Sequence, residues 1–118
     1  MQGLEKMLTL SWPDSALSPN SRCHWSVRAK AAKAARKAAW WATKASGDRV
    51  EGNGKIDLYV VFYPPDKRRY DLDNRIASIK SVLDGVADGL QVDDSRFRLI
   101  CEMGGIIKGG EVRIIITG

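Results

Sequence analysis

Helical periodicity is confined to two segments of this chain, and a strand-like run separates them. From His24 to Ser46, apolar residues recur at spacings of three or four, which predicts one long amphipathic helix. The expected core-facing stripe of this helix is Val27, Ala31, Ala34, Ala38, Trp41 and Ala45. The same spacing predicts a second helix from Asn74 to about Gly89, marked by Ile76, Ile79, Leu83, Val86 and Leu90. Between the helices, residues 55–64 (KIDLYVVFYP) are rich in β-branched and aromatic side chains and indicate a strand.

Three further strands complete the expected fold. They are predicted at residues 4–12, 97–105 and 111–118, and the last two are expected to form a hairpin around KGG at 108–110. The order β-α-β-α-β-β predicts a small two-layer α/β (α+β) fold with a mixed sheet and two main helices. At 118 residues, 1–118 is expected to form a single domain with one core. The pairing of the strands stays open.

Charge and composition narrow the class of partner. The chain has 19 Lys+Arg against 14 Asp+Glu, a formal net charge of +5, which favours an anionic partner and nucleic acid first. No apolar run is long enough to span a bilayer, and the N-terminus lacks a signal-peptide pattern, so a cytoplasmic protein without a membrane partner is expected. Cys23 and Cys101 lie in no CxxC or Cys/His cluster, so neither a disulfide framework nor a zinc site is indicated.

The first helix carries an unbalanced charge. Between residues 21 and 46 there are seven cations and no acid. At about 100° per residue, Lys30, Lys33, Lys37 and Lys44 fall on one side of the helix, with Trp40 beside them. Repulsion between like charges destabilises such a helix, and a polyanion would relieve it. An ordinary solvated lysine face is the alternative; Trp41 is assigned to the core, and the place of Trp40 is left open.

Two aspartates interrupt a second basic cluster. In YDLDN, residues 70–74, Asp71 and Asp73 directly follow KRR at 67–69. On an extended segment, two residues separated by one lie on the same side, roughly 6 to 7 Å apart between Cα atoms. Two carboxylates so placed suit a hard cation such as Mg²⁺. A third ligand is expected from QVDDSR, where Asp93 and Asp94 lie just past the second predicted helix. They can meet Asp71 and Asp73 only if the chain folds back, or if the following strand runs alongside the start of that helix.

A helix-capping role competes with the metal role. Asp73 or Asn74 is a good N-cap for the helix that follows, and carboxylates are favourable at a helix N-terminus. Capping explains one acid at this position, but it explains two in alternation less well.

These residues together resemble the RusA family of Holliday junction resolvases. The resemblance rests on RRYDLDN, on an amphipathic helix containing LDG, and on VDDSR. SPNSRCHW is similar to the family's Pro-x-Asn-x-x-aromatic segment before the first helix. The similarity extends from about Leu8 to the last strand, and chain length agrees with it.

The resemblance implies a nuclease activity and a DNA substrate. The family consists of small homodimeric endonucleases that bind four-way DNA junctions and cut two opposed strands with Mg²⁺ or Mn²⁺ and no organic cofactor, in bacterial or phage recombination and repair. By motif position, the metal-binding and catalytic acids would be Asp71, Asp73 and Asp94, while Asp93 would support the turn. The expected DNA-binding residues are Lys30, Lys33, Lys37, Lys67, Arg68, Arg69 and Arg75.

One position departs from the family pattern. Ala77 stands where the family usually has a lysine one turn after the second motif aspartate, which affects the expected rate more than binding. Lys80, which is taken as the catalytic cation, or Arg75 would substitute. Two other functions are therefore kept: a non-catalytic binder of DNA junctions, and a basic RNA-associated protein in which the aspartates are helix caps. The single histidine, His24, is expected to be a surface or packing residue.

Overall fold

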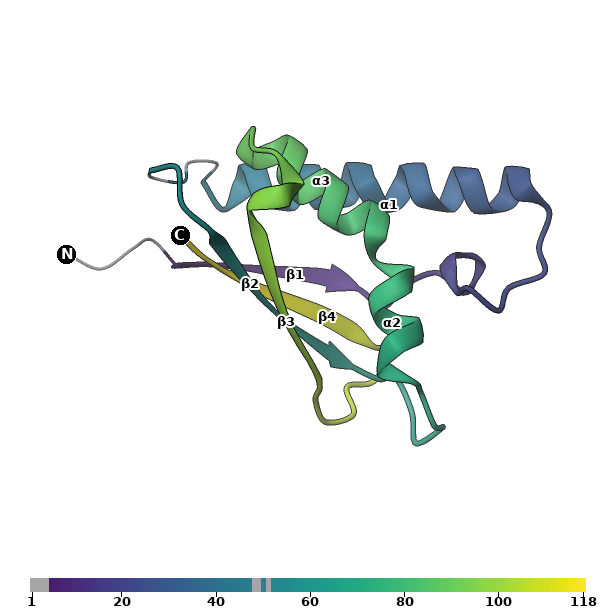
Figure 1. Cartoon of the computed structure of the whole chain (residues 1–118). Coiled ribbons are helices and arrows are strands. Elements are labelled where there is room, and N and C mark those ends of the chain that lie inside the picture. Colours follow the sequence, from purple (N-terminus) through teal and green to yellow (C-terminus); the bar gives the residue numbers. More distant parts are fainter. Residues whose placement is uncertain (1–4, 48–49, 51) are drawn as a thin grey trace.

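The described part of the computed structural model comprises residues 5–47, 50 and 52–118. Leu4, where the first predicted strand begins, lies outside it. The elements, shown in Figure 1, follow one another as β1 (Glu5–Ser11), the 3₁₀ turn η1 (Ser15–Leu17), α1 (Trp25–Ala45), β2 (Ile56–Tyr63), α2 (Leu72–Ser78), α3 (Lys80–Leu90), the 3₁₀ turn η2 (Asp94–Arg96), β3 (Phe97–Met103) and β4 (Glu111–Thr117).

The four strands form one mixed sheet in the order β1-β4-β2-β3. β4 is antiparallel to both β1 and β2, whereas β3 is parallel to β2. Ile114 of β4 lies opposite Leu8 on one side and Val60 on the other, and Val60 in turn lies opposite Cys101 of β3. The expected α+β class with a mixed sheet is therefore confirmed.

The predicted hairpin between the last two strands is wrong. β3 and β4 lie on opposite sides of β2 and do not pair with each other. Residues 104–110 pass the end of β2, where the Gly104 amide donates to the carbonyl of Phe62 (2.8 Å) and the Ile107 amide to that of Pro64 (2.9 Å). The turn signal in KGG was real, since Gly109 and Gly110 have φ of 86° and 76°, but the turn belongs to a crossing loop.

The helices cover one face of the sheet only (Figure 1). Alternate residues of the two central strands point to this face and are buried, as the two-residue period of a strand requires. They pack against Leu8 of β1, Ala39 of α1, and apolar residues of the segment 72–90, which contains α2 and α3. On this face, the buried residues of the central strands are Ile56, Leu58, Val60, Phe62, Val112, Ile114 and Ile116. Val61 of β2, out of step with this alternation, is buried as well.

The predicted core stripe of the first helix is wrong. Trp41 is 60% exposed and Val27 is 52% exposed, while the buried residues of α1 are Ala39 and Thr43. Alanines surround this helix on several sides, so apolar periodicity alone does not identify the packing face. That face is selected by α3, where a Cβ on Gly85 would lie 2.8 Å from the Cβ of Ala39. Trp40 is half-buried, with its ring edge-on to that of Trp41 at 4.9 Å between centroids.

The predicted second helix is divided in two. α2 ends at Ser78 and α3 begins at Lys80, with Ile79 at φ −106° and ψ 15° between them. Ile79 is fully buried in the core, and the Ser78 hydroxyl donates to the carbonyl of Arg75 (2.7 Å). A hydroxyl that bonds to the preceding turn in this way competes with the regular ladder and accompanies helix bends. None of the helices in the described ranges is long and apolar enough to cross a bilayer.

The close approach of α1 and α3 predicts that Gly85→Ala destabilises the fold. The new methyl group would collide with the backbone carbonyl of Arg36, which cannot rotate away. Overpacking of this kind costs about 1 to 3 kcal/mol, partly offset by about 1 kcal/mol of helix propensity gained. Chemical denaturation of the variant should show a lower midpoint. Gly105→Ala is the control because a Cβ there meets nothing within 4 Å. Equal stability of the two variants would contradict the packing described here.

Candidate DNA-binding and metal-binding site

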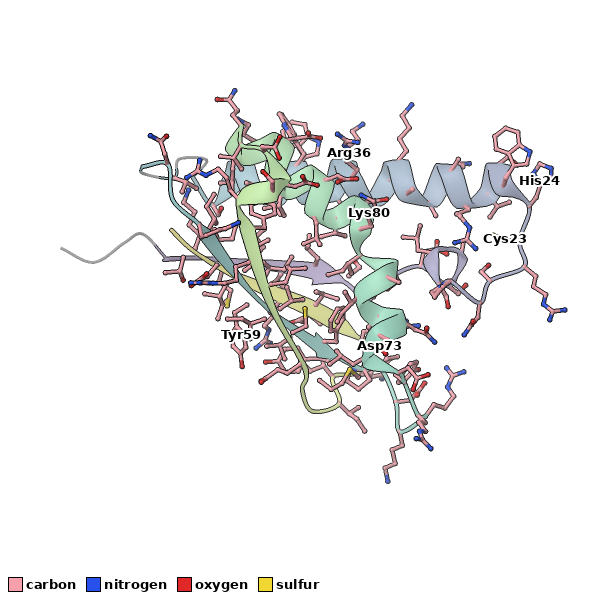
Figure 2. The ribbon with its side chains drawn as sticks, viewed as in Figure 1. Cys23, His24, Arg36, Tyr59, Asp73 and Lys80 are labelled. Atoms are coloured by element: carbon pink, nitrogen blue, oxygen red, sulfur yellow. The ribbon has the colours of Figure 1, made fainter. Side chains whose placement is uncertain are left out.

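Asp71 and Asp73 flank the start of α2. Asp71 is the N-cap residue, with an extended backbone at φ −78° and ψ 130°, and Asp73 lies in the first turn (Figure 2). Both residues are exposed. The expectation that both stand on one extended segment is wrong, because the helix already begins at Leu72.

Capping does not occupy either carboxylate. The Asp71 side chain makes no capping hydrogen bond; its backbone carbonyl accepts from the Arg75 amide at 3.1 Å instead. The alternative in which Asp73 or Asn74 is the N-cap is therefore wrong. Two carboxylates that serve no capping bond at a cationic loop are free to act on something outside the chain.

Asp94 and Lys80 lie near each other. Asp94 begins η2, after α3, and lines a cavity of about 190 Å³ together with Lys80 and Asp84. The Lys80 Nζ lies 3.7 Å from an oxygen of Asp84. Lys80 begins α3, directly after the bend between α2 and α3 (Figure 2). Asp93 accepts a hydrogen bond from the Ser95 amide (2.8 Å), which is the turn role expected for it. Lys80 is thus associated with the Asp84 and Asp94 carboxylates.

The three predicted acids do not form one metal-binding cluster. Within the ranges that the structure describes, no three His, Cys, Asp or Glu side chains are grouped so that they could hold one ion. Asp71 and Asp73 alone still suit Mg²⁺, which is commonly bound by one or two carboxylates, several waters and substrate phosphate oxygens. The donor chemistry therefore fits a two-carboxylate site at the start of α2, without Asp94 in the same group.

An ion pair organises the cationic loop before α2. The Arg68 guanidinium donates to Asp66 (2.9 Å from Nη2 to Oδ2), and the Tyr70 hydroxyl donates to the same carboxylate at 3.0 Å. The hydrogen bond from the Arg68 side chain is the main reason that the pKa of Asp66 falls to about 2. Lys67, Arg68 and Arg69 are all exposed, as a role in contacting phosphates requires.

Arg75 lies against two aromatic rings. Its Cζ is 5.5 Å from the ring centroid of Trp12 and 5.6 Å from that of Tyr70. The Nε of Arg75 is buried and has no hydrogen-bond acceptor among the described residues. Burial lowers the pKa of this guanidinium from its usual value.

The predicted basic face of α1 lies on a different element from the carboxylates at the start of α2. Lys30, Lys33 and Lys37 are exposed along the helix, and the Lys44 Nζ lies 5.7 Å from the ring centroid of Trp40. His24 is exposed and is the N-cap of α1, where its Nδ1 accepts a hydrogen bond from the Ser26 amide at 3.1 Å.

Sequence reasoning missed Trp12, Tyr70 and Asp66. Tyr70 carried a usable signal, since an aromatic residue directly before the aspartate motif and beside arginines is typical of stacking in nucleic-acid sites. Trp12 carried none, because it follows β1 and meets Arg75 only through the fold.

The family assignment follows from comparison with known proteins. A family profile described as Endodeoxyribonuclease RusA matches residues 17–117 of this chain. The chain belongs to the RusA family. A RusA-family chain is a nuclease for Holliday junctions in general, so endodeoxyribonuclease activity on branched DNA is the activity implied.

Individual relatives add less than the family does. An "Uncharacterized protein" of Xylella fastidiosa (strain Temecula1 / ATCC 700964) is 41% identical over 131 residues, which covers 100% of this chain and 81% of the relative. The solved structure "IspF (Plasmodium falciparum) CDP complex" covers 98% of this chain and 95% of its own, with 12% identity. Its TM-score is 0.35, too low to carry an argument.

Two features of this RusA-family chain stand out. Ala77, at the place of the usual family lysine, is an exposed residue of α2. The profile match begins at Leu17, so Trp12 and all of β1 lie outside it.

The Asp66 ion pair predicts a pH-dependent contribution to stability. The carboxyl pKa falls from its usual 3.8 to about 2, so the contribution is present above about pH 4 and is lost as pH falls through about 2. Asp66→Asn should therefore lower the urea midpoint relative to the parent at pH 5, and the difference should shrink toward pH 2. Arg68→Gln removes the other half of the ion pair. Its urea midpoint should therefore also be lower than that of the parent at pH 5, and this gap should also shrink toward pH 2. A gap between parent and Asp66→Asn that is unchanged from pH 5 to pH 2 would contradict this assignment.

Proposed function

We propose that this protein is a divalent-metal-dependent endonuclease that resolves four-way and related branched DNA junctions by hydrolysing paired phosphodiesters. The observation that carries the proposal is the pair of exposed carboxylates at the start of α2, unoccupied by capping, directly after the cationic residues 67–69. Family membership supports the reaction class. Acids used only for structure would instead be engaged in caps or ion pairs, as Asp66 and Asp93 are.

Two groups of cations would contact different parts of the DNA backbone. Lys67, Arg68 and Arg69 would contact phosphates next to the cleaved bond, since they precede the acids directly. Lys30, Lys33 and Lys37 would contact phosphates farther away along α1. Such contacts give affinity and orientation without reading the base sequence, and they make binding depend on salt.

Asp71 and Asp73 would hold the metal ion, with Mg²⁺ as the first choice and Mn²⁺ as the alternative. Such an ion supplies Lewis acidity, which stabilises charge on phosphate oxygens and acidifies water. Asp94 would act in the same reaction from the cavity that it shares with Lys80, by positioning that lysine. Lys80 would place a positive charge against the phosphate as negative charge develops on it.

A homodimer is the assembly that suits this task. Two opposed cuts in a nearly two-fold junction are made most simply by a two-fold protein, in which each subunit cuts one strand.

A second function is favoured by two specific observations. The three acids form no single metal cluster among the described residues, and Ala77 replaces the usual lysine. A non-catalytic junction-binding protein of the same fold would tolerate both features. Cleavage assays separate the two functions because only the nuclease loses a measurable activity when the acids are changed.

Asp73→Asn should abolish cleavage and keep binding. Losing one carboxylate ligand removes several kcal/mol of charge stabilisation, so single-turnover cleavage of an immobile four-way junction should fall by about a hundredfold or more. Binding measured in chelator should be unchanged or tighter, since one negative charge near the phosphates is gone. Asp57→Asn, a similar change on the uncovered face of the sheet, is the control. Metal-dependent nicking that survives in Asp73→Asn would refute the metal role, and tight binding without nicking in the parent would favour the non-catalytic binder.

Lys80→Ala should slow the chemical step without weakening binding. If Lys80 stabilises the developing charge, the single-turnover rate at saturating protein should fall by about 10- to 100-fold. Lys33→Ala should do the opposite, raising the Kd for the junction and leaving the rate at saturation unchanged. A full rate in Lys80→Ala would exclude this lysine as the replacement for the cation missing at Ala77.

A further inference from the structure

A cavity of about 400 Å³ lies between the segment after β1 and the loop that leads into α2. Its lining residues from the first segment are Trp12, Pro13, Ser15 and Ser18, and those from the second are Pro65, Arg68, Tyr70 and Arg75. Its volume is within the range of sites that hold small ligands. Three of its eight lining residues, Trp12, Pro13 and Ser15, lie N-terminal to the residues matched by the family profile.

Arg75 is the unusual member of this cavity. The other half-buried arginines among the described residues have acceptors: Arg28 donates to the carbonyl of Ser21, Arg96 donates to two backbone carbonyls, and Arg113 donates to Glu111. Arg75 is half-buried, and none of the described groups accepts a hydrogen bond from its guanidinium; the charge of Asp71 is near, without a bond. A desolvated donor without a partner is costly, so the arrangement favours an anion that binds there from outside.

We propose that this cavity binds one unpaired nucleotide of the DNA substrate, with its phosphate on the Arg75 guanidinium and its nucleoside against the Trp12, Pro13 and Pro65 wall. This rests on the proposed function, because the nucleotide would belong to the strand that is cut. The charge of Asp71 acts on Arg75, so a nucleotide held here would adjoin the bond at the carboxylates.

The chemistry of the walls matches a nucleotide better than a bare anion. The guanidinium offers a planar set of donors suited to phosphate oxygens, and its Cζ already lies 5.5 and 5.6 Å from the ring centroids of Trp12 and Tyr70. The remaining walls are mainly prolines and the Trp12 ring, which suit a base or sugar, with the Ser15 and Ser18 hydroxyls for polar atoms.

The rim of the cavity is held in place before any ligand arrives. Asp66 accepts from both Arg68 and Tyr70, which fixes the ring that contacts Arg75. The Trp12 ring meets Phe62 of the core edge-on at 6.4 Å between centroids, so the opposite wall is anchored as well. A preformed cavity loses little conformational entropy on binding.

A base inside a stacked duplex would not fit such a cavity, whereas a branch point exposes nucleotides that are cheaper to unpair. The cavity would therefore contribute to the preference for branched over continuous duplex DNA, independently of the metal.

The test is a ¹H–¹⁵N NMR titration of the whole chain with thymidine 5′-monophosphate, thymidine and inorganic phosphate, without metal and without junction DNA. The monophosphate is expected to shift the Trp12 indole N–H in a saturable way, with that signal assigned from Trp12→Phe. Arg75→Gln should raise the Kd by about 10- to 100-fold, the loss expected for charge-assisted hydrogen bonds. Arg98→Gln makes the same chemical change on the uncovered sheet face and should leave the Kd unchanged.

Three results would overturn the inference: equal Kd values in Arg75→Gln and the parent, shifts spread over the lysines of α1 with none at Trp12, or phosphate binding as tightly as the monophosphate. If Arg75→Gln does not fold, Arg75→Lys keeps the charge without the planar donors and should bind several-fold more weakly; an unchanged Kd overturns the inference. A chain that nicks junctions but does not bind the monophosphate at Trp12 keeps the proposed function and loses only this inference. If the chain binds the monophosphate at Trp12 but does not nick junctions, the nucleotide site is kept and the proposed nuclease function is lost.

Discussion

The close packing of α3 on α1 is the contact on which the rest of the structure depends. Gly85 and Gly89 leave room for the backbone of α1, with a Cβ on Gly89 coming 2.7 Å from that of Thr43. At this separation Ala39, Val86 and Leu90 all belong to the core that covers the buried face of the sheet. The position of α3 then fixes the bend at Ile79, and the bend fixes where α2 presents its first turn. The carboxylates at the start of α2 are therefore placed by two glycines more than ten residues away.

The strands were predictable because each side chain alternates between core and solvent, and that period depends only on local sequence. The pairing was not, and the proposed hairpin failed for this reason. The alternation of Val112, Ile114 and Ile116 marks a strand, but only competition among all four strands places it at the centre. Similarly, the length of α1 follows from its sequence, whereas its packing face does not. An alanine-rich helix has several apolar faces, and the one that was used is the one that fits the glycines of α3.

The candidate site, too, could be predicted from the sequence only in part. Asp71, Asp73 and the cations at 67–69 are adjacent in the chain, so their association was visible in the motif. The association of Lys80 with Asp94, and that of Arg75 with Trp12, required the fold, because these groups come from different elements. The Lys80–Asp84 pair, by contrast, lies within α3 at a spacing of four residues. Sequence spacing also suggested a common extended segment for the two motif aspartates, and the helix start at Leu72 replaces that geometry with another. Local reasoning thus identified the acids and the cations adjacent to them in the chain, and missed the contacts between distant elements.

The position of β4 has a consequence for the way the protein reaches its native state. It follows every other element in the chain, yet it lies between β1 and β2 and joins them. Until it is in place, β1 has no hydrogen-bonded neighbour among the described strands, and one edge of β2 is unpaired. Contacts between such distant segments carry a large loop-closure cost and form slowly. Folding should therefore have a late, cooperative step, in which the sheet and the wall that carries Trp12 form together.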